Sequence, residues 1–228
     1  MIRKGLLVLV ILLAVANIHA QDNGEDKFGT WLTYFGNHQI ADKWSIFTEL
    51  QVNHYQFLNN YNQFWTFIGM NHRIDERSSV SAGYAYFNTD PSFTDIEGQE
   101  RVKENRIYEQ FVTRHPIGTF NFNHRYRLEQ RFFAGNPKVR HRIRYRILLT
   151  HPIKGPLFAQ VFDEIFLNFQ EPTFDQNRIF LGLGYRFTNR LNLRLGYLKV
   201  HFSETKYDRL QLFLNINTDL RKKKEESE

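Results

Sequence analysis

The side chains most able to do chemistry in this sequence are arginines that occupy every second position of two neighbouring segments. They share their parity with one glutamate, and the set comprises Arg125, Arg127, Glu129, Arg131, Arg140, Arg142, Arg144 and Arg146. A guanidinium group keeps its proton and pairs with carboxylate or phosphate groups through two parallel hydrogen bonds. The chemistry that this pattern indicates is the binding of anions.

Folding the chain about Gly135-Asn136 would bring the two segments together as an antiparallel hairpin. One register gives the pairs Glu129 with Arg142, Arg127 with Arg144 and Arg125 with Arg146. Like charges directly opposite each other are destabilising, so two of these pairs need compensation from outside the hairpin. Glu164 on the following segment and Glu104 on the preceding one supply part of it. We therefore expect carboxylates from other strands or bound anions among the arginines, within a positively charged lumen.

Patterns for catalysis or metal binding are weak elsewhere in the sequence. The histidines are scattered without metal-ligand spacing, the chain has no cysteine, and no nucleophile elbow occurs. Ser79 or Ser81 could meet His72 at the end of a barrel, which leaves a lipid-modifying site open as an alternative. Gly182 and Gly184 alternate within a strand-like segment, so they are explained better as small residues beside bulky partners than as a phosphate loop. No catalytic residue, metal or cofactor is assigned from the sequence.

The arginines must be positioned by β-strands, because a spacing of two sends side chains to one face of a strand. Between Phe120 and Phe132, five of the seven residues on one parity are apolar and all six on the other are polar. Eleven segments of this kind can be recognised, at 28–38, 44–55, 62–73, 79–88, 104–115, 120–132, 139–149, 157–169, 177–188, 190–201 and 206–219. Most have the length of a tilted membrane-crossing strand, about 10 residues, whereas strands of soluble proteins average about five or six.

The connections between these segments alternate in length along the chain. Short ones are expected near 40–43, 74–77, 115–118, 151–156 and 188–190, and longer ones near 56–61, 89–103, 133–137, 170–176 and 202–205. This alternation is typical of an outer-membrane barrel whose short turns are periplasmic. Bacterial single-chain barrels have even strand numbers, so either segment 28–38 is not a strand or one is missed within 89–103. The prediction is an all-β fold, a single antiparallel transmembrane β-barrel of 10–12 strands, favouring 12.

The apolar parity of such strands is expected to face lipid and the polar parity to face the lumen. A lipocalin-like barrel would point its apolar parity inward, but the strand lengths and the alternating connections favour the membrane arrangement. Aromatic residues near strand ends suit the girdles found at membrane surfaces. The candidates are Trp31, Trp44, Phe132, Tyr185 and Tyr197.

The start of the chain has the organisation of a cleaved secretory signal, with two charged residues, an apolar stretch and small residues before position 21. Residues 1–20 are therefore interpreted as a signal peptide, 21–220 as the barrel and 221–228 as a charged tail. The formal net charge is +6, and the basic residues alternate rather than cluster, which argues against nucleic-acid partners. The expected location is the outer membrane of a Gram-negative bacterium, and the expected partners are outer-membrane lipids and small anions.

Four short stretches carry a resemblance to a known family, namely 104–110, 124–132, 142–147 and 163–168. Through them the sequence resembles a family of uncharacterised outer-membrane β-barrels, domain of unknown function 2490 (DUF2490), over roughly residues 28–220. The resemblance implies the fold and the location and brings no reaction with it. The chain departs from outer-membrane proteins in general at its end, where Leu220 and a charged tail replace the usual terminal aromatic residue.

Three functions are compatible with these observations. The first is a porin-like pore or binding barrel for small anions, and the second is a filled barrel with a structural or assembly role. The third is a lipid-modifying outer-membrane enzyme. The lumen candidates in all three are the arginines above together with Glu129 and Glu164, and the sequence assigns no substrate.

Overall fold

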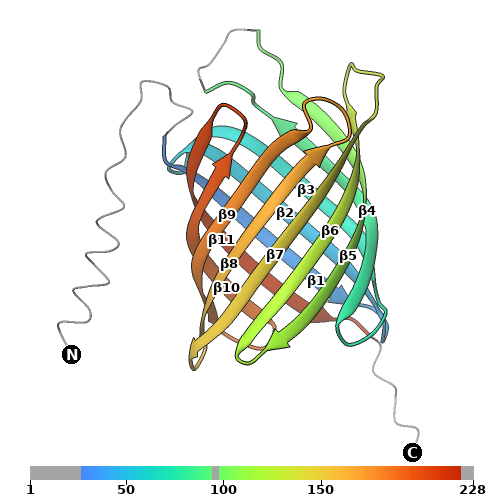
Figure 1. Ribbon diagram of the computed structural model, residues 1–228, viewed down its shortest axis with the longest axis vertical. Helices are drawn as coiled ribbons and strands as arrows, with labels where there is room; N and C mark the ends of the chain where they lie inside the picture. Colours follow the sequence, from blue (N-terminus) through green and yellow to red (C-terminus); the bar gives the residue numbers. More distant parts are fainter. Residues whose placement is uncertain (1–26, 94–97, 222–228) are drawn as a thin grey trace, which may run out of the picture.

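The computed structural model describes residues 27–93 and 98–221, and these form one closed β-barrel (Figure 1). The expected signal peptide at 1–20 and all but the first residue of the tail at 221–228 lie outside the described residues. In the described part of the chain, no helix is long and apolar enough to span a membrane.

Eleven strands build the wall, and each of them corresponds to one of the segments recognised in the sequence. They are β1 (Gly29–Gln39), β2 (Trp44–Gln56), β3 (Asn59–Arg73), β4 (Ser78–Thr89), β5 (Val102–Ile117), β6 (Phe120–Phe133), β7 (Arg140–Lys154), β8 (Leu157–Asn168), β9 (Phe174–Arg186), β10 (Leu191–His201) and β11 (Lys206–Asp219).

The favoured count of 12 strands is wrong, because the barrel closes with 11. Each strand runs antiparallel to the one before it, so the first and the last of eleven strands run in the same direction. β1 and β11 accordingly pair in parallel over the whole length of β1, with Thr33 opposite Phe213. The suspected segment at the start is thus a strand paired on both sides, and the described part of the connection after β4 contains no additional strand.

The connections differ between the two ends of the barrel, although less regularly than expected. At the upper end in Figure 1, where β1 begins, residues 90–101 form the longest connection. At the lower end the turns are short, and Gly118 and Gly155 take positive φ angles of 57° and 56° that favour glycine. The connection expected to be long near 56–61 is in fact a two-residue turn at Phe57–Leu58, because Asn59 already pairs with Gln56.

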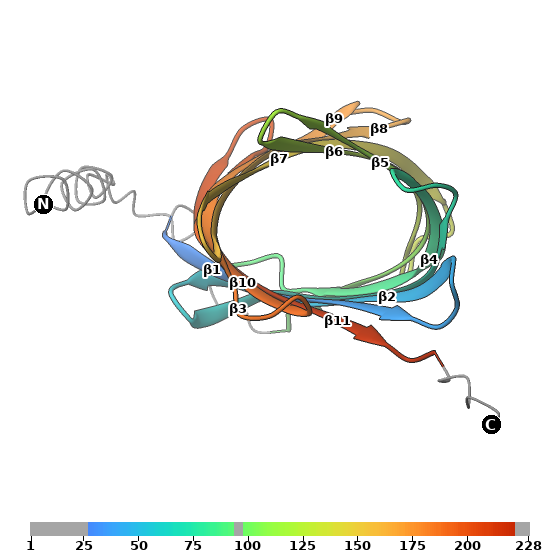
Figure 2. The same ribbon diagram turned by 90° about the horizontal axis from the view of Figure 1, so that it is seen from below.

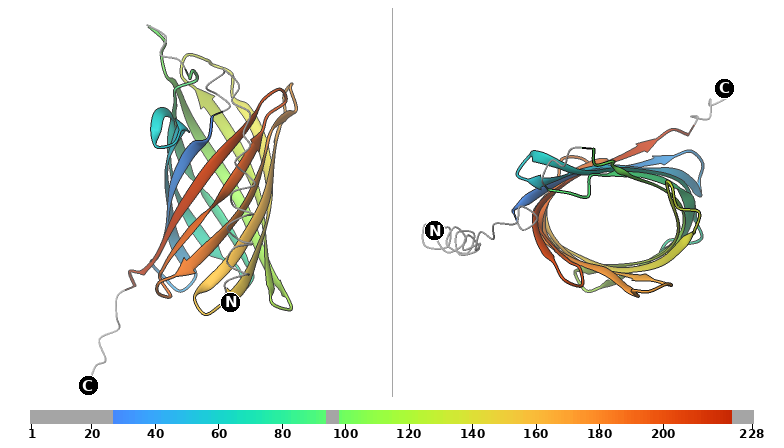
Figure 3. Two further views of the ribbon diagram at one scale, coloured as in Figure 1. Left: turned by 90° about the vertical axis from the view of Figure 1, so that its left-hand side faces the viewer. Right: turned by 90° about the horizontal axis from the view of Figure 1, so that it is seen from above.

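Successive side chains of each strand point alternately into the lumen and away from it. The barrel wall has an oval outline when seen from below (Figure 2) or from above (Figure 3). The outer surface exposes large apolar side chains on many strands, including Ile68, Tyr84, Ile107, Phe111, Tyr126, Ile143, Ile179, Leu181, Leu183 and Leu195. Leu181, for example, is 60% exposed in the middle of β9. The apolar parity is therefore on the outside, as expected for strands that contact lipid.

The inner surface is not uniformly polar, and this corrects the expectation for several strands. A buried cluster inside the barrel contains Trp31, Trp65, Phe67, Phe87, Tyr108, Phe162, Phe180 and Phe213. Trp31, which was expected in a membrane-surface girdle, is only 6% exposed and packs edge-on against Trp65 with ring centroids 5.8 Å apart. Both parities of β1 carry aromatic residues, so alternation alone did not identify the inward one.

Glycines on the inner surface make room for these rings. A Cβ atom at Gly184 would lie 2.1 Å from Cζ of Phe158, and one at Gly182 would lie 2.5 Å from Cζ of Phe180. The interpretation of these two glycines as small residues beside bulky partners is confirmed.

Candidate functional site

The β6–β7 hairpin has the register expected from the sequence. Glu129 pairs with Arg142, while the other facing positions are Arg127 with Arg144 and Arg125 with Arg146. β6 and β7 keep these side chains on one face because each strand continues without a bulge across all three pairs. The repulsion between facing arginines is therefore present in the folded wall and must be compensated there.

Carboxylates from three strands compensate most of it by linking arginines in a chain. Glu129, fully buried, accepts hydrogen bonds from Arg142 Nη2 at 2.5 Å and from Arg144 Nη1 at 2.7 Å. Glu164 on β8 accepts from Arg144 Nε at 2.9 Å and from Arg125 Nη2 at 2.6 Å. β9, the next strand after β8, contributes Asp175, which accepts from Arg142 Nη1 at 2.6 Å. Each glutamate thus bridges two arginines that would otherwise repel, and Arg144 is shared between the two glutamates.

A second, smaller group is held by Glu104 near the upper end of β5. Its carboxylate accepts from Arg106 Nε at 2.5 Å and from Arg131 Nε at 2.6 Å. Arg106 also lies 3.4 Å from the centre of the Phe87 ring, where the aromatic face attracts its charge. Arg140, by contrast, is exposed at the upper rim, with its guanidinium 5.4 Å from the Phe133 ring. Of the candidate set, Arg140 is therefore the member that the structure leaves exposed at the rim.

Several inward arginines lack a carboxylate partner closer than 3.9 Å among the described residues. They include Arg127, Arg146, Arg178 and Arg194. Arg127 donates to Gln110 Oε1 at 2.7 Å and is 3.9 Å from Glu129, whereas Arg194 donates to the side chains of Gln160 and Asn215. Neutral amides accept these hydrogen bonds without cancelling the charge, so positive charge remains in excess.

The excess concentrates where two chambers of the lumen meet. An upper chamber of about 670 Å³ and a lower chamber of about 490 Å³ share the lining residues Phe35, Arg125, Arg127, Arg146, Phe162 and Phe213, a layer that we call the waist. Eight arginines and five carboxylates line the upper chamber, and seven basic residues and one carboxylate line the lower one. The described lumen is therefore divided at the waist, and its lower part is the more positive.

Hydrogen-bonding capacity is also left over at the waist and beside it, at Arg194 of the lower chamber. The Nε–H groups of Arg125, Arg146 and Arg194 are buried and have no hydrogen-bond partner in the described part of the chain. Arg125, Arg127 and Arg194 are each close enough to Arg146 for their charges to repel it. Buried donors without partners are costly, and buried like charges add to that cost. An anion at the waist would relieve both.

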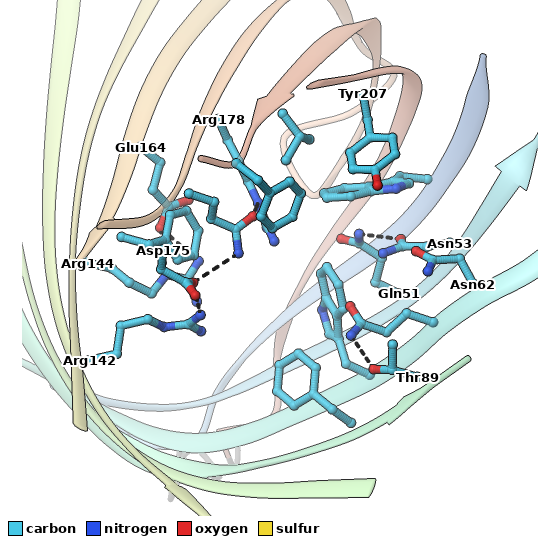
Figure 4. Close-up of a pocket in the computed structure, with 18 of the residues that line it drawn as sticks. Gln51, Asn53, Asn62, Thr89, Arg142, Arg144, Glu164, Asp175, Arg178 and Tyr207 are labelled. Atoms are coloured by element: carbon cyan, nitrogen blue, oxygen red, sulfur yellow. Dashed lines mark hydrogen bonds and ion pairs between the residues drawn. The ribbon is translucent and has the colours of Figure 1, made fainter. Parts of the chain in front are cut away.

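The wall of the upper chamber that faces the arginines is made mainly of amides and aromatic rings, with one buried carboxylate, Glu49, which accepts from Trp65 Nε1 at 2.8 Å. Figure 4 shows Gln51 and Asn53 on one side of this chamber, opposite Arg142, Arg144 and Asp175. Alternation in the sequence did not predict this wall, because it assigned the aromatic residues on β1 to β4 to lipid. It also missed Asp175, because β9 was expected to begin at 177 and begins at Phe174.

The residues considered for catalysis do not come together. His72 is opposite Val80 in the β3–β4 ladder and stacks on Trp44 at the outer surface, with ring centroids 4.3 Å apart. Ser79 and Ser81 are adjacent to Val80 and therefore point the other way, into the lower chamber. No group of three or more His, Cys, Asp or Glu side chains in the described residues could hold a metal ion.

These features define a closed β-barrel with an apolar outer wall and a lumen lined on one side by an arginine–carboxylate network. The chain belongs to the family described as protein of unknown function DUF2490, whose model matches residues 28–211. No curated protein matches the chain. A structural similarity was found to the translocator domain of the autotransporter NalP from Neisseria meningitidis, with a TM-score of 0.43 and 10% identity, covering 73% of this chain and 71% of that one.

Proposed function

We propose that the protein is an outer-membrane β-barrel that binds small anions inside its lumen. The location is supported by the outer wall, where apolar side chains are exposed on many neighbouring strands. Soluble proteins rarely expose contiguous apolar patches larger than a few hundred Å². Lipid would cover these side chains, and the hydrogen bonds of every strand are satisfied by closure of the barrel.

The observation that carries anion binding is the set of buried, unpaired guanidinium N–H groups at the waist. Arg125 and Arg146 face each other across the β6–β7 ladder, yet Glu164 is the carboxylate that pairs with Arg125, and it is shared with Arg144. A guanidinium cannot lose its proton to relieve this imbalance. Phosphate or a small carboxylate has the charge and the acceptor oxygens that these groups need.

The experiment is to unfold the purified barrel with urea in lipid vesicles, with and without inorganic phosphate. A ligand that binds only the folded state at about 100 times its Kd stabilises that state by about 2.7 kcal/mol. We expect phosphate to stabilise the wild type, and we expect Arg146→Met to abolish this effect while making the phosphate-free barrel more stable by removing a repelled charge. Arg140→Met at the exposed rim is the matched control and should keep the phosphate effect.

Two results would count against the proposal. Recovery of the protein as a soluble periplasmic species after fractionation would contradict the membrane location. Equal phosphate effects in wild type and Arg146→Met would contradict binding at the waist.

A purely structural role is the second candidate, and the shared carboxylates favour it. The chain from Asp175 through Glu129 to Glu164 ties β6, β7, β8 and β9 together on the inside of the barrel. Under this alternative, phosphate has no effect on unfolding and planar bilayers containing the protein show no anion-selective conductance.

A further inference from the structure

We infer that the upper chamber is a binding site for a saccharide that carries a carboxylate or phosphate group. The inference rests on the proposed anion-binding function and adds the class of molecule to which the anion belongs. It depends on the wall that faces the arginines, which a simple anion would leave unused.

Buried polar atoms on this wall have no partner in the described part of the chain. They are Trp31 Nε1, Asn53 Nδ2 and Gln211 Oε1, and all three residues are more than nine-tenths buried and line the upper chamber. Two of the atoms are donors and the third is an acceptor. Their ligand must therefore both accept and donate hydrogen bonds, which hydroxyl groups do and a fully ionised inorganic anion does not.

A chain of hydrogen bonds fixes the direction in which the Asn53 amide points. Thr33 Oγ1 donates to Gln51 Oε1 at 2.7 Å, and Gln51 Nε2 donates to Asn53 Oδ1 at 2.6 Å. The Nδ2 donor of Asn53 is left over at the end of this chain, on the side of the chamber seen at the right of Figure 4. The amide is thus oriented before any ligand arrives.

Aromatic rings supply a surface for the apolar face of a sugar ring. Trp31, Trp65 and Phe87 line the chamber, and successive rings pack against each other with centroids 5.8 and 5.4 Å apart. The face of an aromatic ring carries partial negative charge, which attracts the weakly positive C–H groups on a sugar face. The volume of about 670 Å³ lies within the usual range of small-molecule sites, roughly 300–1,000 Å³, and leaves room for one or two sugar rings.

Arg178 of β9 is placed to bind the acidic group. Its guanidinium lies 4.7 Å from the ring centres of both Trp31 and Phe166, between the aromatic wall and the ion-pair network. Its Nε donates to Gln176 Oε1 at 3.0 Å, and no carboxylate of the described residues lies within ion-pair distance of it. The remaining donors of its fork can therefore pair with a carboxylate or phosphate while the rings contact the sugar.

The fluorescence of the tryptophans tests this site. The chain has three tryptophans, and Trp44 lies on the outer wall. A Trp44→Phe barrel therefore keeps only Trp31 and Trp65, which both line the chamber. We expect its emission to titrate with glucuronate and with glucose 6-phosphate. Glucose, which lacks the acidic group, should bind at least about tenfold more weakly, the equivalent of losing one charge-assisted hydrogen bond. Acetate should also bind at least about tenfold more weakly, because it lacks the sugar ring that contacts the aromatic and amide wall.

Three substitutions at two positions of β9 separate recognition from general effects on the strand. Arg178→Met should weaken glucuronate binding about tenfold or more and leave the weak glucose binding unchanged. Arg186→Met, at the opposite end of the same strand and against Phe158, should leave both unchanged. Arg178→Lys keeps the positive charge but loses the two parallel N–H donors of the guanidinium, so we expect intermediate affinity for glucuronate. This variant also tests the site if Arg178→Met folds poorly.

The outcomes distinguish this inference from the function on which it rests. Equal binding of acetate and glucuronate, or no loss in Arg178→Met, would overturn the saccharide site while the phosphate effect at Arg146 leaves anion binding intact. If glucuronate produces no fluorescence change and phosphate no stabilisation, both proposals fail. Tight binding of glucose that is independent of Arg178 would replace the acidic ligand by a neutral one and refute the inference as stated.

Discussion

Neutralising Glu129 is the sharpest test of the network, because this carboxylate has no exposed surface and faces four guanidinium groups. It accepts hydrogen bonds from Arg142 and Arg144 at 2.5–2.9 Å, and Arg106 and Arg127 lie 3.6 and 3.9 Å away. The Glu129→Gln substitution keeps the shape of the side chain but removes the charge and replaces an acceptor by a donor that points at other donors. Removing one partner of a buried ion pair costs about 3–5 kcal/mol, and we expect a loss in that range.

The assay is equilibrium urea unfolding in lipid vesicles, followed by tryptophan fluorescence and by gel mobility before and after heating. Glu109→Gln on the neighbouring strand is the matched control, since Glu109 lies on the outer face and contributes no charge to the network, and its carboxylate accepts from Gln130 Nε2 at 3.0 Å. We expect the control to lose far less stability than Glu129→Gln. If the two variants unfold at the same urea concentration, the network does not stabilise the barrel in the way that its geometry indicates.

Three further predictions concern the wall and its turns. Ile143→Arg places a charge on the outer face and should cost roughly 2–4 kcal/mol in folding into bilayers, with Ile143→Leu as a neutral control; equal yields would contradict the assignment of faces. Gly83→Ala should destabilise the barrel by about 1–3 kcal/mol in the same urea assay, since its Cβ would lie 2.2 Å from the carbonyl oxygen of Ile68. The backbone N–H of Arg77 donates a hydrogen bond to the Asp75 carboxylate and lowers the pKa of Asp75. This contact is therefore present above the usual Asp pKa and is lost as the pH falls through the lowered pKa of Asp75. The amide chemical shift of Arg77 should change over that pH range, and Asp75→Asn should remove the change.

Local patterns in the sequence were sufficient to predict the strands and the arginine register. Alternation at 120–132 and 139–149 fixed which side chains share a face, and the turn near Gly135 fixed how the two strands align. These properties involve residues that are neighbours along the chain. The pairing of Glu129 with Arg142 therefore follows from the order of residues in a single hairpin.

Features that depend on distant strands could not be predicted in this way. The parallel pairing of β1 with β11 joins residues about 180 positions apart, and no local pattern marks it. Asp175 was assigned to a loop because the apolar alternation of β9 is weak at its start. Trp31 was assigned to the membrane surface because it is an aromatic residue near the start of β1, where the weak alternation does not show which parity points inward. In each case the missing information was the position of a neighbouring strand.

The same register that builds the network also determines where its charge remains unbalanced. From the upper end of the β6–β7 ladder downward, the pair of Glu129 and Arg142 comes first, and the two arginine pairs lie below it. Glu164 is opposite Arg146 in the β7–β8 register, but its carboxylate bonds to Arg144 and Arg125, so Arg146 forms no ion pair among the described residues. The unpaired guanidinium therefore lies at the lower end of the network, and this is the level at which the two chambers meet. The proposed anion site at the waist therefore depends on the order of residues along two strands and needs no specialised loop.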